Sequence, residues 1–114
     1  PNPFATPDLC FRFHYFALRK MHFLLRAKAL VAFPGGYGTC DELFEALTLV
    51  QTGKIRPIPV VLVGQAFWRR AIDFGFLVDE GMIGADDVRL FRMVDSAEDA
   101  VQVLSEFYGG TPPE

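Results

Sequence analysis

The sequence predicts an α/β fold in which helices flank a parallel sheet. Short apolar segments alternate with amphipathic ones along the chain, and this alternation is typical of layered α/β domains. The segment IPVVLVG at 58–64 is a nearly continuous β-branched run, which indicates a strand buried on both faces. A length of 114 residues fits one domain and is too short for two. We therefore expect a single domain over residues 1–114.

Hydrophobic periodicity and turn residues set the order of the expected elements. In chain order they are a strand over 9–14, a helix over 17–28, a strand over 29–33, a helix from Cys40 to near Gly53, a strand over 58–64, a helix over 65–82, a strand over 88–95 and a helix over 96–109. Ser96 is the expected N-cap of the last helix. In such folds ligands bind at the carboxyl ends of the strands.

The helix that begins at Cys40 has two distinct faces in the sequence pattern. The expected apolar face consists of Leu43, Phe44, Ala46, Leu47 and Val50. The expected polar face consists of Asp41, Glu45, Thr48 and Thr52, with Glu42 at its edge.

Composition and charge exclude several classes of protein. A net charge of −3 gives no indication of nucleic-acid binding, and no apolar run reaches the length of a membrane span. Cys10 and Cys40 match no metal-binding spacing and predict free thiols in a reducing cytoplasm. The chain begins abruptly with PNPFATPDLC and is 51% hydrophobic. We therefore expect it to be the C-terminal part of a longer polypeptide.

The segment PGGYGT at 34–39 leaves a predicted strand and enters a predicted helix. Glycines at such a corner let a phosphate approach the backbone N–H groups of the helix start. The spacing matches neither the dinucleotide fingerprint nor the Walker loop. A tight turn explains the glycines equally well, and Thr39 with Glu42 fits a capping box that needs no catalysis. Spacing alone leaves both interpretations open.

Basic residues precede this corner on the helix over 17–28. Arg19, His22 and Arg26 share one face of it. A solvated face explains Arg26, whereas the Arg19 guanidinium is suited to bidentate phosphate contacts. His22 is expected to be a packed or solvent-facing histidine. Cys40 lies where thiol pKa values tend to fall, but no histidine nearby in the sequence would activate it as a nucleophile.

The pair RK at 19–20, followed by PGGYGTCDELFEALTLVQTGKIRPIPVVLV, resembles the LOG (LONELY GUY) family of cytokinin riboside 5′-monophosphate phosphoribohydrolases. The similarity runs from about Phe11 to Met82 and is closer to the bacterial branch of the family than to the short plant enzymes. Many such proteins carry the label "lysine decarboxylase", but no pyridoxal-phosphate lysine site can be placed in this sequence. The resemblance implies a Rossmann-like fold that hydrolyses the N-glycosidic bond of a nucleoside 5′-monophosphate.

The same resemblance implies roles for particular residues. Arg19 and Glu42 would be the catalytic pair. The nucleotide contacts would be Lys20, Gly35, Gly36, Tyr37, Gly38, Thr39 and Thr48. It implies no cofactor and no metal, and a homodimer or higher homo-oligomer. The N-terminal strand and glycine-containing loop that complete the nucleotide site in this family are absent, so the expected sheet is incomplete on that side.

The implied chemistry fits a carboxylate. Breaking the N-glycosidic bond develops oxocarbenium character on the ribose, which a carboxylate beside the ring stabilises. Glu42 is expected in the first helical turn, where the helix dipole favours its ionised form. One alternative is a non-catalytic nucleotide or phosphorylated-cofactor carrier, similar to molybdenum-cofactor carriers. Another is a structural fragment without a ligand. The base that is released is not determined by the sequence.

Overall fold

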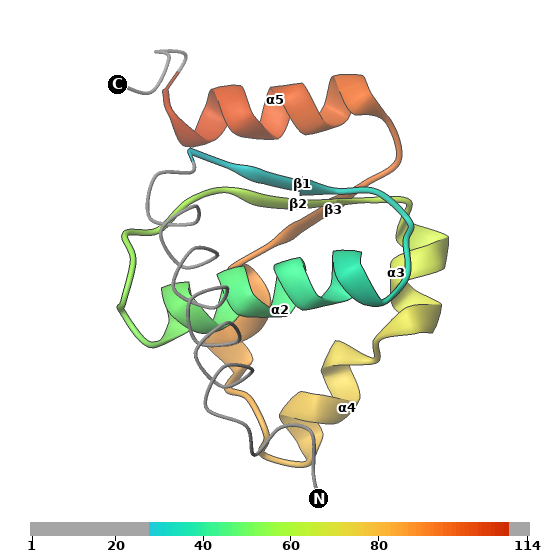
Figure 1. The fold of residues 1–114 in the computed structure, drawn as a ribbon, viewed down its shortest axis with the longest axis vertical. Coiled ribbons are helices and arrows are strands. Elements are labelled where there is room, and N and C mark those ends of the chain that lie inside the picture. Colours follow the sequence, from blue (N-terminus) through green and yellow to red (C-terminus); the bar gives the residue numbers. More distant parts are fainter. Residues whose placement is uncertain (1–27, 110–114) are drawn as a thin grey trace, which may run out of the picture.

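The computed structural model describes residues 28–109, and its centre is a three-stranded parallel sheet (Figure 1). The strands are β1 (Leu30–Ala32), β2 (Val60–Val63) and β3 (Arg92–Val94), in the spatial order β1-β2-β3. Both pairings are parallel, which confirms the α/β class. The predicted strand over 9–14 and the predicted helix over 17–28, apart from Lys28, lie outside the described residues.

Helices cover both faces of this sheet. They are α2 (Tyr37–Gln51), α3 (Gln65–Ala71), α4 (Phe74–Asp79) and α5 (Ala97–Phe107), and a short 3₁₀ helix covers Ala85–Arg89. Figure 1 shows α2 on one side of the sheet and α5 on the other. In the part of the chain described here, every helix is too short or too polar to cross a bilayer.

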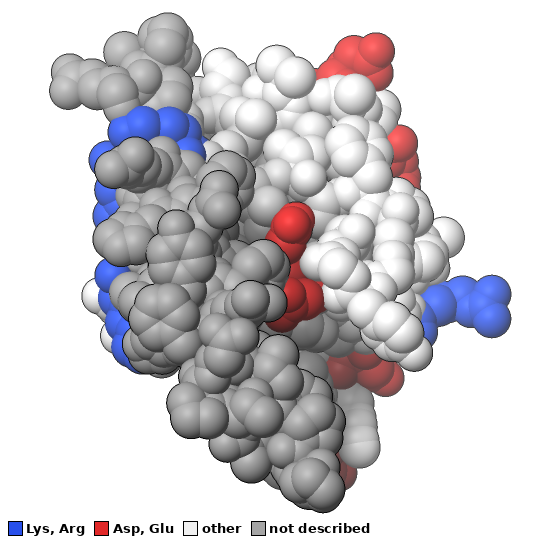
Figure 2. All heavy atoms as spheres, in the orientation of Figure 1, with Lys and Arg blue, Asp and Glu red and all other residues white. Residues whose placement is uncertain are grey.

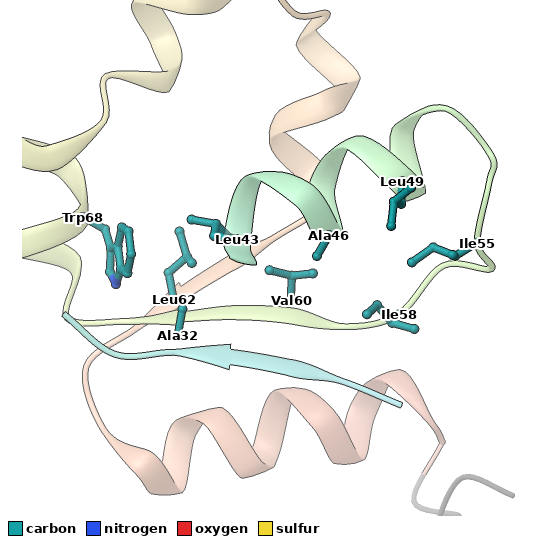
Figure 3. Packing of buried hydrophobic residues seen from close by; sticks show 9 residues of the cluster. All are labelled: Ala32, Leu43, Ala46, Leu49, Ile55, Ile58, Val60, Leu62 and Trp68. Atoms are coloured by element: carbon teal, nitrogen blue, oxygen red, sulfur yellow. The ribbon is translucent and has the colours of Figure 1, made fainter. Parts of the chain in front are cut away.

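Strand β2 supplies side chains to two separate hydrophobic clusters, because successive side chains of a strand point to opposite faces. Val60 and Leu62 face α2 and Trp68 in the larger cluster, which Figure 3 shows at close range. Val61 and Val63 pack on the opposite face with Ala100 of α5. All four strand residues are buried, which confirms the expectation of a strand covered on both sides.

Helix α2 begins three residues earlier than predicted, at Tyr37 instead of Cys40. Its buried residues are Leu43, Ala46 and Leu49. The predicted apolar face was therefore wrong in two respects: it omitted Leu49, and it included Phe44, which is 41% exposed. The prediction was displaced around the helix toward Phe44 and Leu47, because apolar residues continue on that flank of the buried stripe.

The single helix predicted over 65–82 is two helices in the structure. Ile72 is extended, with φ −139° and ψ 122°, and it ends α3. The Asp73 carboxylate then accepts a hydrogen bond from the Phe76 backbone N–H at 2.9 Å and starts α4. An N-cap residue of this kind favours a new helix start over continuation of the old one, so capping overrode the apolar periodicity.

The strand predicted over 88–95 is shorter, and Ser96 behaves as predicted. The structure forms a strand only over Arg92–Val94, because Val88 and Arg89 belong to the 3₁₀ helix and Leu90 caps it. The Ser96 hydroxyl accepts a hydrogen bond from the Asp99 N–H at 3.1 Å, which confirms it as the N-cap of α5.

The attachment of α2 to the sheet is expected to depend on Leu43. This side chain is fully buried in the cluster of Figure 3, and truncation of a buried leucine leaves a cavity. We expect Leu43→Ala to lower the free energy of unfolding by about 2–5 kcal/mol. Chemical denaturation followed by circular dichroism measures the change. Val101→Ala, at a residue that is 64% exposed on α5, is the control and should stay within about 0.5 kcal/mol. Equal losses in the two variants would contradict this packing role.

Candidate functional site

The three parallel strands end at the same edge of the sheet, at the right of Figure 1. Phe33 to Gly36 connect β1 to α2, Gly64 follows β2 directly, and Asp95 follows β3 directly. The Gly64 N–H donates to the carbonyl of Val94 at 2.7 Å, so the segments after β2 and β3 are joined. This edge is where parallel α/β sheets bind ligands.

The segment Gly35–Thr39, called the glycine loop below, contains the start of α2. The first helical hydrogen bond runs from the Cys40 N–H to the Gly36 carbonyl at 3.0 Å. The N–H groups of Tyr37, Gly38 and Thr39 therefore precede the first intrahelical bond and have no acceptor within the helix. Tyr37 is 98% exposed and Gly36 and Gly38 are exposed as well. These donors are accessible to an anion, and the helix dipole favours one there.

The predicted capping box of Thr39 and Glu42 was wrong. Gly36 is the N-cap residue, and within the described residues no side chain caps it. Thr39 is already the third residue of the helix. Its side chain lies over Gly35 instead: a Cβ on Gly35 would meet the Thr39 Oγ1 atom at 2.2 Å. Gly35 is therefore a glycine because the fold leaves no room for a side chain.

Gly36 and Gly38 have no such explanation within the described residues. A Cβ on either one would meet no described atom within 4 Å, and neither has a positive φ. The described part of the chain thus requires a glycine at Gly35 and leaves open space at Gly36 and Gly38. Open space over exposed N–H donors is what close approach of a phosphate requires.

Glu42 lies in the second turn of α2, because the helix begins at Tyr37. The predicted position in the first turn, with its favourable dipole interaction, was therefore wrong. Glu42 is exposed and follows Gly38 by four residues and Thr39 by three, which places the three on neighbouring positions of the helix surface. Helical side chains tilt toward the N-terminus. Glu42 thus belongs to the part of the helix surface that adjoins the glycine loop.

Thr48 is exposed on α2 but does not share this location. It follows Glu42 by six residues, which corresponds to about 9 Å along the helix axis and about 120° around it. It lies instead on the face of Asp41 and Glu45, and it borders a small apolar pocket with Phe44 and Phe74. The structure brings the glycine loop and Glu42 together, and it leaves Thr48 apart from them.

The remaining predicted residues fall into two groups. Arg19, Lys20 and His22 lie outside the described residues, so their roles stay predictions. Cys40 is half-buried and packs against the larger hydrophobic cluster, which supports the prediction that it is not a nucleophile.

Sequence patterns did not single out a second group of residues at this edge. The Asp95 carboxylate accepts two hydrogen bonds from Gln65, from its backbone N–H and from Nε2, both at 3.0 Å. Gly64, beside them, has φ +98° and lies against Pro34. The sequence signal that could have identified Asp95 was a carboxylate immediately after a strand, at the carboxyl edge of the sheet. In the structure this carboxylate links the segment after β3 to the segment after β2.

The basic side chains near the α2–β2 connection belong to a different edge. Lys28, Lys54 and Arg56 line an open depression, and Figure 2 shows blue side chains along the left margin, on the side of that connection. The glycine loop is at the opposite end of the strands, so these cations are not part of the candidate site. Across residues 28–109, no three histidine, cysteine or acidic side chains are grouped as metal ligands.

Comparison with known proteins identifies the family of the chain. A family model described as "Possible lysine decarboxylase" matches residues 3–104. The cytokinin riboside 5′-monophosphate phosphoribohydrolase LOG7 of Arabidopsis thaliana is 33% identical over 90 residues, which are 78% of this chain and 42% of that protein. The corresponding LOG of Oryza sativa subsp. japonica is 36% identical over 91 residues, which are 78% of this chain and 37% of that protein.

The chain thus spans about two fifths of the length of these relatives. The family match nevertheless covers most of the chain and includes both the glycine loop and Glu42. With the sheet, the exposed helix start and the adjacent carboxylate in place, the chain belongs to the LOG family, which the possible lysine decarboxylase model describes.

Proposed function

We propose that this chain carries the phosphate-binding loop and the catalytic carboxylate of a nucleoside 5′-monophosphate phosphoribohydrolase. The reaction adds water across the N-glycosidic bond and yields a free base and ribose 5-phosphate. The observation that carries the proposal is the open space over Gly36 and Gly38, next to the helical turn that bears the exposed Glu42. The described part of the chain itself has no need for a glycine at either position.

The 5′-phosphate occupies the start of α2 in this proposal. The free N–H groups of Tyr37, Gly38 and Thr39 donate to its oxygens, and the helix dipole adds a favourable field. The missing side chains at Gly36 and Gly38 allow the phosphate to reach these donors. Arg19 and Lys20, as the family resemblance implies, supply the positive charge that the glycine loop lacks.

Glu42 acts on the ribose. With the phosphate at the first turn, the second turn of the same helix lies beside the sugar. Its carboxylate stabilises the positive charge that develops on the ribose ring and orients the attacking water or a ribose hydroxyl. A carboxylate of this kind acts as an electrostatic stabiliser or base. Arg19 holds the ribose phosphate or the leaving side.

The substrate is an AMP-type or cytokinin-ribotide nucleotide. The names of the relatives specify cytokinin riboside 5′-monophosphates as their substrates. We also propose that the protein acts in the cytoplasm as a homo-oligomer. The exposed Phe33 and Tyr37 beside and within the glycine loop support a contact surface near the site, and light scattering of the purified protein tests it.

A non-catalytic carrier of phosphorylated ligands is the second candidate. It shares the glycine loop, but a pure phosphate binder gains nothing from a carboxylate next to its anion, because like charges repel. Glu42 therefore favours the enzyme. Chromatography of AMP incubated with the complete protein separates the two, since only the enzyme releases adenine.

Replacement of the carboxylate tests the assigned role. We expect Glu42→Gln in the complete protein to slow base release from AMP-type nucleotides about 10²- to 10⁴-fold, with the fold and the circular dichroism spectrum unchanged. Glu80→Gln, at an exposed glutamate that ends α4, is the matched control and should retain full activity. Full activity in Glu42→Gln would exclude this residue from the chemistry.

Two glycine variants should change stability and activity in different directions. Gly38→Ala lies in the first turn of α2 without crowding, so helix propensity should raise the free energy of unfolding by about 0.5–1 kcal/mol. The new methyl group should nevertheless block the phosphate and raise KM about tenfold or more.

Gly35→Ala is the contrasting variant. Its Cβ would overlap Thr39 Oγ1, so we expect both activity and stability to fall, the latter by about 1–3 kcal/mol. Denaturation and steady-state kinetics measure both variants. Unchanged KM in Gly38→Ala would mean that no ligand approaches the backbone there.

A further inference from the structure

We propose that Asp95 is a positioning residue for the glycine loop, acting through Gln65, Gly64 and Pro34. The inference rests on the proposed function, in which that loop binds the 5′-phosphate. It assigns the positioning of the loop to a residue that directly follows β3. Among the described residues, the hydrogen bonds of the Asp95 carboxylate run to Gln65 and not to the loop. Its effect passes through three consecutive contacts.

The first contact fastens the corner after β3 to the corner after β2. Both Asp95 oxygens accept from Gln65, one from the backbone N–H and one from Nε2, each at 3.0 Å. The Arg69 guanidinium donates to Gln65 Oε1 at 3.0 Å and so turns the amide with its Nε2 toward Asp95. Hydrogen bonds to a carboxylate are among the stronger ones in proteins. The hydrogen bond from the Gly64 N–H to the Val94 carbonyl, at 2.7 Å, also links these two corners.

The second contact lies between Gly64 and Pro34. Gly64 has φ +98°, a conformation that residues with a side chain rarely adopt. A Cβ on it would meet Pro34 Cγ at 3.2 Å and Phe67 Cβ at 3.9 Å. The β2–α3 corner therefore lies directly behind the Pro34 ring. A shift of Gly64 toward the loop would push Pro34, and a shift away would leave it without support.

The third contact transmits a displacement of Pro34 to the phosphate donors. Pro34 is bonded to Gly35, and Gly35 has no space because Thr39 Oγ1 would lie 2.2 Å from a Cβ there. Pro34, Gly35 and the first turn of α2 therefore move together. Asp95 holds the β2–α3 corner in place, and this corner packs against Pro34, which leads into the glycine loop.

A simpler role for Asp95 is that it only caps the first N–H of α3. Such a role predicts a loss of stability without an effect on the loop. The chain offers a matched control, because Asp73 also accepts a backbone N–H at the start of a short helix, from Phe76 at 2.9 Å. Asp73 starts α4, which follows α3 and not a strand of the sheet.

The first experiment compares Asp95→Ala with Asp73→Ala in the complete protein without ligand. We expect similar falls in Tm for both. Hydrogen exchange of the Cys40 amide, which makes the first hydrogen bond of α2, should become about tenfold faster in Asp95→Ala and stay unchanged in Asp73→Ala. For AMP as the probe, KM should rise about tenfold in Asp95→Ala with kcat within about twofold. Asp95→Asn, which keeps an acceptor for the Gln65 N–H, should restore most of the KM.

Equal exchange and equal KM in the two alanine variants would overturn the proposal. If the unmodified protein releases no base from AMP-type nucleotides, the proposed function fails by itself. The exchange measurement then still decides the positioning role, since it needs neither substrate nor turnover.

The second experiment isolates the contact with Pro34. Gly64→Ala and Gly53→Ala both place a side chain at a positive φ, +98° and +73°, so both share the backbone strain. Only Gly64→Ala crowds a neighbour, because a Cβ on Gly53 meets nothing within 4 Å. We expect faster exchange of the Cys40 amide in Gly64→Ala alone. An unperturbed loop in Gly64→Ala would show that the corner does not support it and would overturn the proposal.

Discussion

Burial of β2 on both faces is the constraint on which the described fold depends. Val60 and Leu62 require a cover on one side, and Val61 and Val63 require a cover on the other. Helix α2 and helix α5 meet these two requirements. Because β2 pairs in parallel with both β1 and β3, the three strands must end at one edge. The glycine loop, Gly64 and Asp95 are thereby neighbours although they are far apart in the sequence.

The same constraint separates two kinds of glycine at that edge. Gly35 and Gly64 are needed by the chain itself, one for lack of space and one for its positive φ and its contact with Pro34. Gly36 and Gly38 serve neither need in the described residues, which is why they carry the functional proposal. The sequence alone does not distinguish the glycines that the fold needs from those that it does not, since all four positions carry the same residue type.

Sequence patterns predicted the parts of the fold that depend on continuous apolar runs and local caps. The VVLV run and the Ser96 cap are determined by neighbouring residues, so they were predicted correctly. Competition between local signals was harder to judge. Asp73 interrupts a periodic helix pattern, and Gly36 replaces Thr39 as the N-cap of α2. The role of Asp95 was not predictable, because it depends on contacts 30 residues apart.

The early start of α2 changes how the candidate site works. With Tyr37 as the first helical residue, the phosphate donors occupy the first turn and Glu42 occupies the second. The macrodipole acts mainly on the first turn, so its field serves the phosphate and not the carboxylate. One rigid helix then carries both groups, and its geometry fixes their separation at about one turn, or 5 Å, along the axis.

A fixed spacing of this kind is what catalysis by positioning requires. It also locates the adjustable part of the site. Because Glu42 and the donors belong to α2, which Leu43, Ala46 and Leu49 fasten to the sheet, they do not move relative to each other. The approach to the helix, from Pro34 to Gly36, is the segment whose conformation depends on its neighbours. Support of Pro34 by Gly64 is therefore expected to matter more for substrate binding than for the chemical step, because it holds the approach to the donors and leaves the spacing between donors and carboxylate within α2 unchanged.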